Sequence, residues 1–303
     1  MSPIPPDPGV IAVIGPTAVG KTAFAIALAD ELRARGEHPV AVSCDALQVY
    51  RGVELLTGAA SAAERAALEH RLLGVLEVSD RCTAGRFAQM AHAEIDALLA
   101  AGRRPIAVGG TGLYLRAALA DLELRPAVDE TVRAAVVAEL EHNGPEAAHA
   151  RLAARAPAVA AAIAVTDRQR ITRALELLDS GLQPPSGRGG ELWTTATRHP
   201  TRLIGLVRDR DELHALIDAR VEAIVAAGAA DEVRRAAAAG ASDSVRSAVG
   251  FDELLAGDVE TFKTRTRRYA RRQLTWMRRL PEIELVSLSG RGVAEAARAV
   301  VQD

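Results

Sequence analysis

The sequence predicts an α/β fold with a parallel-sheet core, an inserted helical domain and a helical C-terminal segment. Short apolar runs rich in β-branched residues alternate with stretches of helical spacing, as expected for strands buried on both faces of a parallel sheet. Between about residues 122 and 200 only helical patterns occur, and they also fill most of the chain after residue 207. The simplest arrangement is a core of residues 1–121 and 201–303, interrupted by a helical insertion of residues 122–200.

The core elements follow one another as strand and helix. Residues 10–15 (V-I-A-V-I-G) predict a buried strand, and Phe24, Leu28 and Leu32 recur at helical spacing within a helix predicted over 22–35. By the same patterns, further strands are predicted at 39–44, 105–108 and 202–207, and helices at 87–101, 130–141, 146–155 and 167–179. Apolar strands that alternate with amphipathic helices indicate a parallel sheet.

The composition excludes several classes of protein. With 303 residues, 49% of them hydrophobic and 25% charged, the chain can bury a core, and its net charge of −2 gives no global attraction to nucleic acid or membranes. Cys44 and Cys82 are too few for a disulfide framework or a four-cysteine metal site, and the seven histidines show no metal-binding spacing. We find no secretory signal and no apolar run of roughly 18 to 20 residues, so we expect a cytoplasmic protein without a membrane partner.

One motif predicts a phosphate-binding loop (P-loop). The string Gly15-Pro16-Thr17-Ala18-Val19-Gly20-Lys21-Thr22 matches G-x-x-x-x-G-K-[ST] and lies between a predicted strand and a predicted helix. In such a loop successive N–H groups point at phosphate oxygens, and the helix N-terminus adds partial positive charge. Lys21 adds a full charge, and the Thr22 hydroxyl can ligate Mg²⁺, the expected cofactor. All residues of the motif are therefore candidate ligands of a diphosphate or triphosphate.

The motif does not identify the phosphate compound. Enzymes that hydrolyse nucleoside triphosphates usually carry an acidic residue at the end of a second apolar strand. Here the strand predicted at 105–108 ends in Gly109-Gly110-Thr111-Gly112 instead. The nearest carboxylate is Asp45, which follows the strand at 39–44 at the carboxyl edge of the sheet, where such folds bind ligands. A metal ligand, a general base and a helix N-cap are all compatible with this position.

A basic segment near the C-terminus predicts contact with a polyanion. Residues 263–279 contain eight Lys or Arg, no acidic residue, and the aromatic residues Tyr269 and Trp276. A helix over this segment places Ala270 and Met277 on one face and most of the arginines on another. Because the segment offers no carboxylate to pair with these cations, we expect them to contact phosphates.

Four further strings follow the P-loop in order. They are D-A-L-Q-V-Y-R-G at 45–52, G-G-T-G-L-Y at 109–114, D-R-Q-R-I-T-R-A-L-E at 167–176 and K-T-R-T-R-R-Y-A-R-R-Q-L-T-W-M-R at 263–278. Together with the P-loop, these strings resemble the tRNA dimethylallyltransferases, also called tRNA isopentenyltransferases, over residues 11–279. Two segments depart from the family pattern: residues 53–60 read V-E-L-L-T-G-A-A and lack its usual Lys-Pro pair, and Phe251-Asp252 replaces a tyrosine and a basic residue.

The resemblance implies an enzyme that transfers a dimethylallyl group from dimethylallyl diphosphate to N6 of adenine 37, beside the anticodon of tRNA. It assigns Thr17 and Arg220 to the leaving diphosphate and makes Asp45 the candidate general base. The target adenine must leave the anticodon stack to react, and we expect the protein to act as a monomer. The positions implied to contact tRNA are Asp45, Ala46, Leu47, Gln48, Thr111, Arg133, Gln169, Arg170, Ile171, Thr172, Arg173, Arg268, Arg272, Gln273 and Trp276.

Three other functions remain open from the sequence. A prenyltransferase for free adenine nucleotides would need neither the basic segment nor the inserted domain. A small-molecule kinase with the same loop would bind Mg·ATP tightly and transfer a phosphate. A non-catalytic RNA-binding protein would be indifferent to substitution of Asp45.

Overall fold

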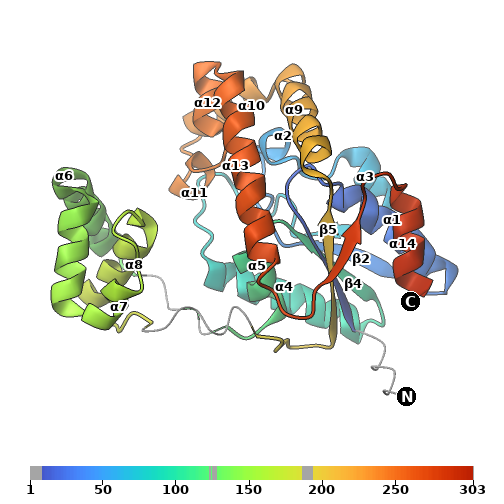
Figure 1. The fold of residues 1–303 in the computed structure, drawn as a ribbon, viewed down its shortest axis with the longest axis horizontal. Coiled ribbons are helices and arrows are strands. Elements are labelled where there is room, and N and C mark those ends of the chain that lie inside the picture. Colours follow the sequence, from blue (N-terminus) through green and yellow to red (C-terminus); the bar gives the residue numbers. More distant parts are fainter. Residues whose placement is uncertain (1–8, 123, 125–127, 186–193, 303) are drawn as a thin grey trace. The chain divides into compact units, whose positions relative to one another are not determined.

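The computed structural model describes residues 9–122, 124, 128–185 and 194–302. The chain divides into two compact units, a core of residues 1–122 with 195–303 and an insertion of residues 123–194. Figure 1 shows the core built around a sheet with helices on both of its faces. Over the described residues, no helix is both long and apolar enough to cross a membrane.

The core sheet has six parallel strands in the order β3-β2-β4-β1-β5-β6. Their bounds are β1 (Val10–Ile14), β2 (Pro39–Ser43), β3 (His70–Arg71), β4 (Arg104–Gly109), β5 (Thr201–Val207) and β6 (Glu284–Ser287). In the centre of the sheet Ala12 is in register with Ala107 of β4 and Leu203 of β5. The insertion therefore enters the chain between two strands that flank the same central strand.

Helices surround this sheet and continue beyond its carboxyl edge. In the core they are α1 (Lys21–Ala34), α2 (Glu54–Thr57), α3 (Ala62–Ala67), α4 (Ala84–Ala100), α5 (Gly112–Leu119), α9 (Arg210–Ala226), α10 (Ala229–Ala238), α11 (Asp243–Arg246), α12 (Phe251–Ala256), α13 (Val259–Met277) and α14 (Val293–Gln302). In the insertion they are α6 (Glu130–Arg155), α7 (Pro157–Ala161) and α8 (Arg168–Asp179).

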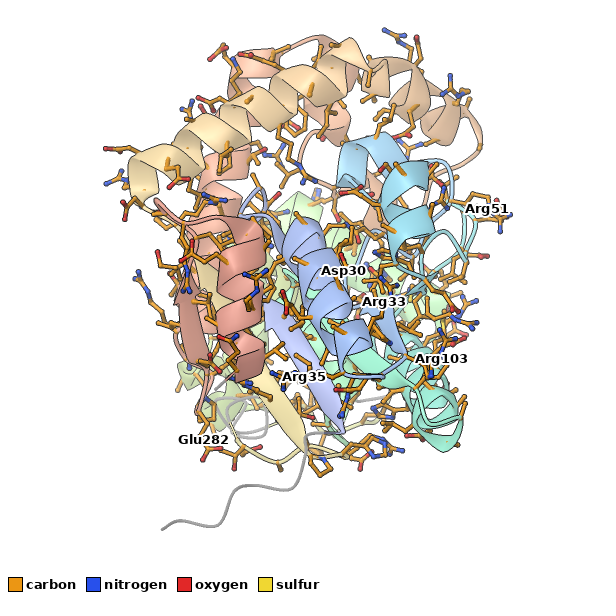
Figure 2. The ribbon with its side chains drawn as sticks, turned by 90° about the vertical axis from the view of Figure 1, so that its right-hand side faces the viewer. Asp30, Arg33, Arg35, Arg51, Arg103 and Glu282 are labelled. Carbon is orange, nitrogen blue, oxygen red and sulfur yellow. The ribbon has the colours of Figure 1, made fainter. Side chains whose placement is uncertain are left out.

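The alternation of side chains along each strand builds two hydrophobic layers. In β1, Ala12 and Ile14 face the layer formed with α4 and α5, whereas Ile11 and Val13 face the layer formed with α1 and α14. Both sets are apolar and buried, which is why the strand reads as a continuous hydrophobic run. On the solvent side of α1, Asp30 and Arg33 form an ion pair at 2.8 Å (Figure 2).

The insertion has a small core of its own. Val136 and Leu140 of α6 pack with Ile171 and Leu175 of α8, and all four side chains are at most 5% exposed. Although α6 is continuous in its bounds, Gly144 has φ 79° and ψ 169° and precedes Pro145, so the helical path breaks there. This break matches the separate helices predicted at 130–141 and 146–155.

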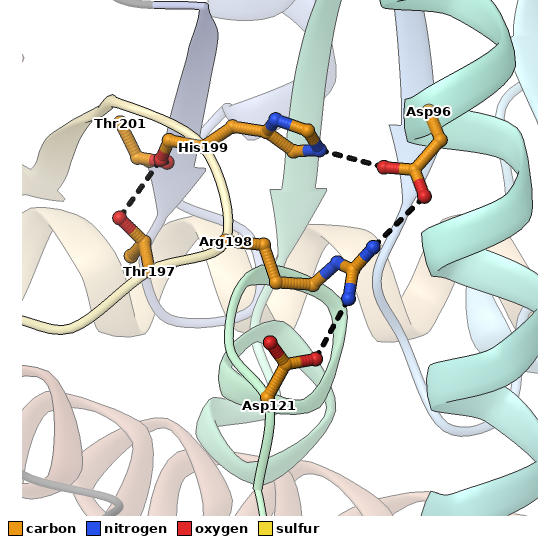
Figure 3. A network of polar contacts seen from close by, with 6 residues as sticks. All are labelled: Asp96, Asp121, Thr197, Arg198, His199 and Thr201. Carbon is orange, nitrogen blue, oxygen red and sulfur yellow. Dashed lines mark hydrogen bonds and ion pairs between the residues drawn. The ribbon is translucent and has the colours of Figure 1, made fainter.

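Polar contacts join the core segment that precedes the insertion to the core segment that follows it. Arg198 forms ion pairs with Asp96 at 2.9 Å and Asp121 at 2.7 Å (Figure 3). Its backbone N–H donates to the Leu119 carbonyl. His199 lies 2.6 Å from the same Asp96. The sequence pattern assigned residues 195–200 to the insertion. They belong to the core instead, because these contacts fasten them to α4 and the end of α5.

The predicted fold class is confirmed, as are the strands predicted at 10–15, 39–44, 105–108 and 202–207. Two edge strands were missed. β3 contains only two residues, and β6 contains Leu285, whose 54% exposure breaks the apolar pattern expected of a buried strand. A short or half-exposed edge strand gives little hydrophobic signal.

Candidate active site

A cavity of about 620 Å³ lies in the core unit at the carboxyl edge of the sheet. Its lining comes from the P-loop, from the ends of β2 and β4, from the segment around α2, and from α9 and α13. These segments are far apart in the sequence, and the parallel sheet brings them together because all of its strands end at this edge. Lys21 and Asp45, on which the sequence interpretation depends most, both line this cavity.

The backbone of the P-loop is shaped to turn its N–H groups inward. Ala18 and Gly20 have φ values of 63° and 106°, and left-handed residues of this kind create a concave run of N–H groups. Gly15 is required for packing, since a Cβ atom there would lie 3.0 Å from the Leu206 carbonyl oxygen. Neither a side-chain cap nor an acidic residue occupies the first turn of α1. The helix N-terminus is therefore open to an anion.

Lys21 lies at the centre of this loop. Its Nζ atom donates hydrogen bonds to the carbonyl oxygens of Gly15 at 3.1 Å and Pro16 at 2.9 Å. The pKa of Lys21 is lowered to about 8, mainly by burial and also by the nearby positive charge of Arg220, while the negative charge of Asp45 acts in the opposite direction. A dianion placed beside Lys21 would favour the charged ammonium, so this site is suited to phosphate.

Asp45 follows β2 and faces the same cavity. Its carboxylate accepts a hydrogen bond from the Leu47 N–H at 3.0 Å, which fixes a turn at the end of the strand. The preceding residue, Cys44, donates its N–H to the Val108 carbonyl at 2.7 Å and so keeps β2 against β4. A Cβ atom at Gly109 would lie 2.4 Å from the Cys44 carbonyl oxygen, so glycine is needed at position 109 for the ends of β2 and β4 to lie this close together. One carboxylate oxygen is engaged by the turn, which leaves the other for a ligand.

Arg220 of α9 also lines the cavity, near Lys21. Its Nη2 atom donates to the Thr57 carbonyl at 3.0 Å, and a Cβ atom at Gly58 would lie only 1.8 Å from that nitrogen. Glu232 is 6% exposed and accepts from the N–H groups of Leu55 at 3.0 Å and Leu56 at 2.9 Å, thereby capping α2. The unusual segment 53–60 thus forms an ordered wall that holds Arg220 in place.

Gln48 and the apolar part of the wall complete the cavity. Gln48 accepts from the Ser43 hydroxyl at 3.0 Å, and its amide nitrogen lies 3.4 Å from the Thr57 carbonyl. The apolar lining was not predicted from the sequence; it includes Leu56, Val221, Ile224, Val249 and Phe262. The spacing of positions 217, 221 and 224 on α9 could have indicated an inward face. The departing segment 53–60 contributes Leu56, Thr57 and Gly58 to the lining, whereas Phe251 and Asp252 follow the lining residue Val249 without lining the cavity themselves.

The inner face of α13 packs against the P-loop and the β4–α5 turn. The Thr111 hydroxyl lies 3.2 Å from the Tyr269 hydroxyl, and the Thr17 N–H donates to Gln273 Oε1 at 2.8 Å. A Cβ atom at Gly112 would lie 1.9 Å from the Trp276 ring, so this ring lies directly over the start of α5. Two residues implied to contact tRNA, Gln273 and Trp276, therefore face the protein interior.

The outer face of α13 divides into two halves. Lys263 pairs with Glu222 at 2.8 Å, Arg265 pairs with Glu253, and Arg267 bonds to Asp218 at 2.9 Å. The expectation that these cations lack carboxylate partners was wrong for this half, because the partners come from α9, α12 and the start of α13 itself. Among the described residues, no carboxylate lies within ion-pair distance of the exposed Arg268, Arg271, Arg272 and Arg278.

The insertion carries a second basic group around a buried carboxylate. Glu176 is 1% exposed and pairs with Arg133 at 3.3 Å and Arg173 at 3.1 Å. These residues, with Gln169 and Thr172, line a hollow of about 400 Å³. Ile171, also implied to contact tRNA, is fully buried in the core of the insertion, so its side chain cannot reach an RNA surface.

The fold and this cavity define the chain as a P-loop α/β protein in which a basic phosphate cradle faces a carboxylate. A model of the IPP transferase family matches residues 48–280, which is well over half of the chain. The chain belongs to the IPP transferase family, and the resemblance identified from its motifs is confirmed.

Known relatives align over almost the whole chain. The tRNA dimethylallyltransferase of Thermobifida fusca is 40% identical over 308 residues, covering 96% of this chain and 94% of the relative. That of an Anaeromyxobacter species is 41% identical over 292 residues, covering 92% and 94%. Among solved structures, the tRNA isopentenylpyrophosphate transferase of Bacillus halodurans is 30% identical, covers 97% of this chain and 95% of that one, and has a TM-score of 0.68. The comparisons therefore describe a family of transferases that use a prenyl diphosphate.

Proposed function

We propose that this protein is a tRNA dimethylallyltransferase that transfers a dimethylallyl group from dimethylallyl diphosphate to N6 of adenine 37 in tRNA. The observation that carries the proposal is that Lys21 of the P-loop and Asp45 at the end of β2 line one cavity. A cavity of about 620 Å³ lies within the range of ligand sites that hold a drug-sized molecule. It can accommodate a five-carbon donor together with one base.

The leaving diphosphate is assigned to the cationic end of the cavity. As the bond between the allylic carbon and oxygen breaks, the electron pair moves to the diphosphate, where negative charge grows. The P-loop N–H groups, the Lys21 ammonium, the Thr17 hydroxyl and the Arg220 guanidinium would stabilise that charge. The apolar wall formed by Ile224, Val249 and Phe262 is suited to the hydrocarbon part of the donor.

The acceptor nitrogen is assigned to the side of Asp45. N6 of adenine forms the new bond to carbon and must lose a proton, which the Asp45 carboxylate accepts as general base. Gln48 lines the cavity, and Thr111 bonds to Tyr269, which also lines it, so both are assigned to the base, which has to be extruded from the anticodon loop. The exposed arginines of α13 and those around Glu176 in the insertion are assigned to the RNA backbone.

The residues present fit a Mg²⁺ ion held jointly with the substrate. Thr22 lines the cavity in the first turn of α1, and no cluster of three or more metal-binding side chains occurs in the described part of the chain. Mg²⁺ commonly binds through one or two protein oxygens together with substrate phosphates. The Thr22 hydroxyl would hold such an ion, whose charge would add to the stabilisation of the diphosphate. We propose that the protein acts on one tRNA as a monomer.

The test is to incubate the protein with anticodon stem-loop RNA, dimethylallyl diphosphate and Mg²⁺, and to analyse the nucleosides by mass spectrometry. We expect N6-dimethylallyl adenosine at position 37, and a loss of at least 100-fold in rate for Asp45→Asn, which keeps the shape of the side chain but removes the base. Asp30→Asn, on the solvent side of α1, is the matched control. If AMP reacts faster than the RNA, or ATP transfers a phosphate instead, the proposal is wrong.

A further inference from the structure

Gln273 occupies an unusual position between the phosphate cradle and the basic helix. It belongs to α13 but is only 7% exposed, and its Oε1 atom accepts the Thr17 N–H at 2.8 Å. Its Nε2 atom lies so close to Gly110 that a Cβ atom there would approach it to 2.4 Å. One amide side chain is thus wedged between the P-loop and the end of β4.

This amide takes a hydrogen-bond donor away from the phosphate site. Thr17 lies within the P-loop, where N–H groups normally point at phosphate oxygens, but its own N–H is directed at α13. Position 17 of the loop is therefore held by a residue of α13 that lies 256 positions later in the sequence. Any shift of α13 along or across the sheet has to move this part of the cradle.

The exposed side of the same helix carries Arg268 and Arg271, which are assigned to RNA, whereas Arg272, also assigned to RNA, lies next to the inner face and lines the cavity as well. Tyr269, Gln273 and Trp276 follow one another at spacings of four and three residues and share the inner face. Arg268, Arg271 and Arg272 are exposed between them, and the Arg272 guanidinium lies 5.5 Å from the Tyr269 ring centre. A polyanion that fixes these arginines also fixes the turns of helix that present Tyr269 and Gln273 to the cavity.

We propose that Gln273 is a positioning residue that couples RNA binding on the outer face of α13 to the phosphate cradle, so that RNA and diphosphate bind with positive cooperativity. The inference rests on the proposed function, because it takes RNA as the polyanion. RNA bound to α13 would order the P-loop at Thr17 in advance, so a diphosphate would lose less conformational freedom on binding. Linkage requires that the diphosphate strengthen RNA binding by the same factor.

The experiment measures this factor by calorimetry with inorganic pyrophosphate and Mg²⁺, in the presence and absence of anticodon stem-loop RNA. In the wild-type protein we expect RNA to tighten pyrophosphate binding by at least about fivefold, the lower end of typical couplings. In Gln273→Met, which keeps the length of the side chain but loses the acceptor, the factor should fall below about twofold. Gln302→Met, at the exposed end of α14, should retain the wild-type factor.

Either of two results would overturn the inference: a wild-type factor near one, or an unchanged factor in Gln273→Met. Should that variant not fold, amide hydrogen exchange on the wild-type protein decides, since RNA should slow exchange over residues 15–22 and an unchanged rate refutes the coupling. Prenyl transfer assayed in the same samples separates this inference from the proposed function. If RNA and pyrophosphate bind cooperatively but no prenyl group is transferred, the proposed function is refuted and the positioning role of Gln273 still stands.

Discussion

Replacing Gly58 by alanine should displace Arg220 and weaken the use of the diphosphate donor. The new Cβ atom would lie 1.8 Å from Arg220 Nη2 and 2.5 Å from its Cζ, so the guanidinium has to leave its place. It would lose its hydrogen bond to the Thr57 carbonyl. A hydrogen bond made by a charged group contributes about 1.5–3 kcal/mol. If Arg220 has to be in place to stabilise the leaving group, kcat/KM for the donor should fall roughly 10- to 100-fold.

The same substitution also strains the backbone, and a second glycine separates the two effects. Gly58 and Gly36 have φ values of 56° and 84°, but nothing lies within 4 Å of a Cβ atom at Gly36. Backbone strain should cost each alanine variant about 1 kcal/mol of stability, seen as a fall of about 2 to 4 °C in Tm, and Gly58→Ala should lose more because Arg220 also loses its hydrogen bond. Only Gly58→Ala should lower kcat/KM, while its affinity for RNA stays unchanged. Equal kcat/KM values in the two variants would refute the assigned role of Arg220.

Three further outcomes are expected. Lys21→Ala should abolish turnover while RNA affinity stays within a few-fold, measured by single-turnover kinetics and a filter-binding titration; a parallel loss of both would contradict the separation of the two sites. Because the pKa of Lys21 is lowered to about 8 and pyrophosphate favours the charged form, pyrophosphate affinity should decline above pH 8 by up to about tenfold per pH unit. Lys21→Arg should show a shallower decline in the same calorimetric series. Arg272→Ala should weaken RNA binding and reduce its salt slope by about one, whereas Arg35→Ala, an equal change of charge at the far end of α1 (Figure 2), should leave the slope unchanged.

The inner part of the fold could be predicted because burial leaves a strong pattern. β1, β2, β4 and β5 are buried on both faces, so each appears in the sequence as an uninterrupted apolar run. The hydrophobic pattern is weaker in the edge strands of the sheet. In β6, for example, Leu285 is exposed where a central strand would have a buried residue. The end of the insertion also had no local signal. It depends on ion pairs of Arg198 with residues that lie well back along the chain.

The candidate site was predictable where a local motif defines it and unpredictable where distant residues meet. The P-loop is one continuous string, and a strand end placed Asp45 at the same edge of the sheet. By contrast, three cations of α13 are matched by carboxylates on other elements, and Ile171 faces inward, although each belongs to a segment rich in basic residues. Which side of a helix meets water depends on its neighbours, and a single sequence does not reveal them.

The clasp formed by Arg198, Asp96 and Asp121 has a consequence for how this protein can vary. Because Arg198 pairs with Asp121, the core residues that precede and follow the insertion lie close together on the core. A loop whose ends already meet can be shortened, lengthened or exchanged at small entropic expense. The insertion could therefore be replaced during evolution while the catalytic residues of the core stay in place, so that the same core acquires a different RNA substrate.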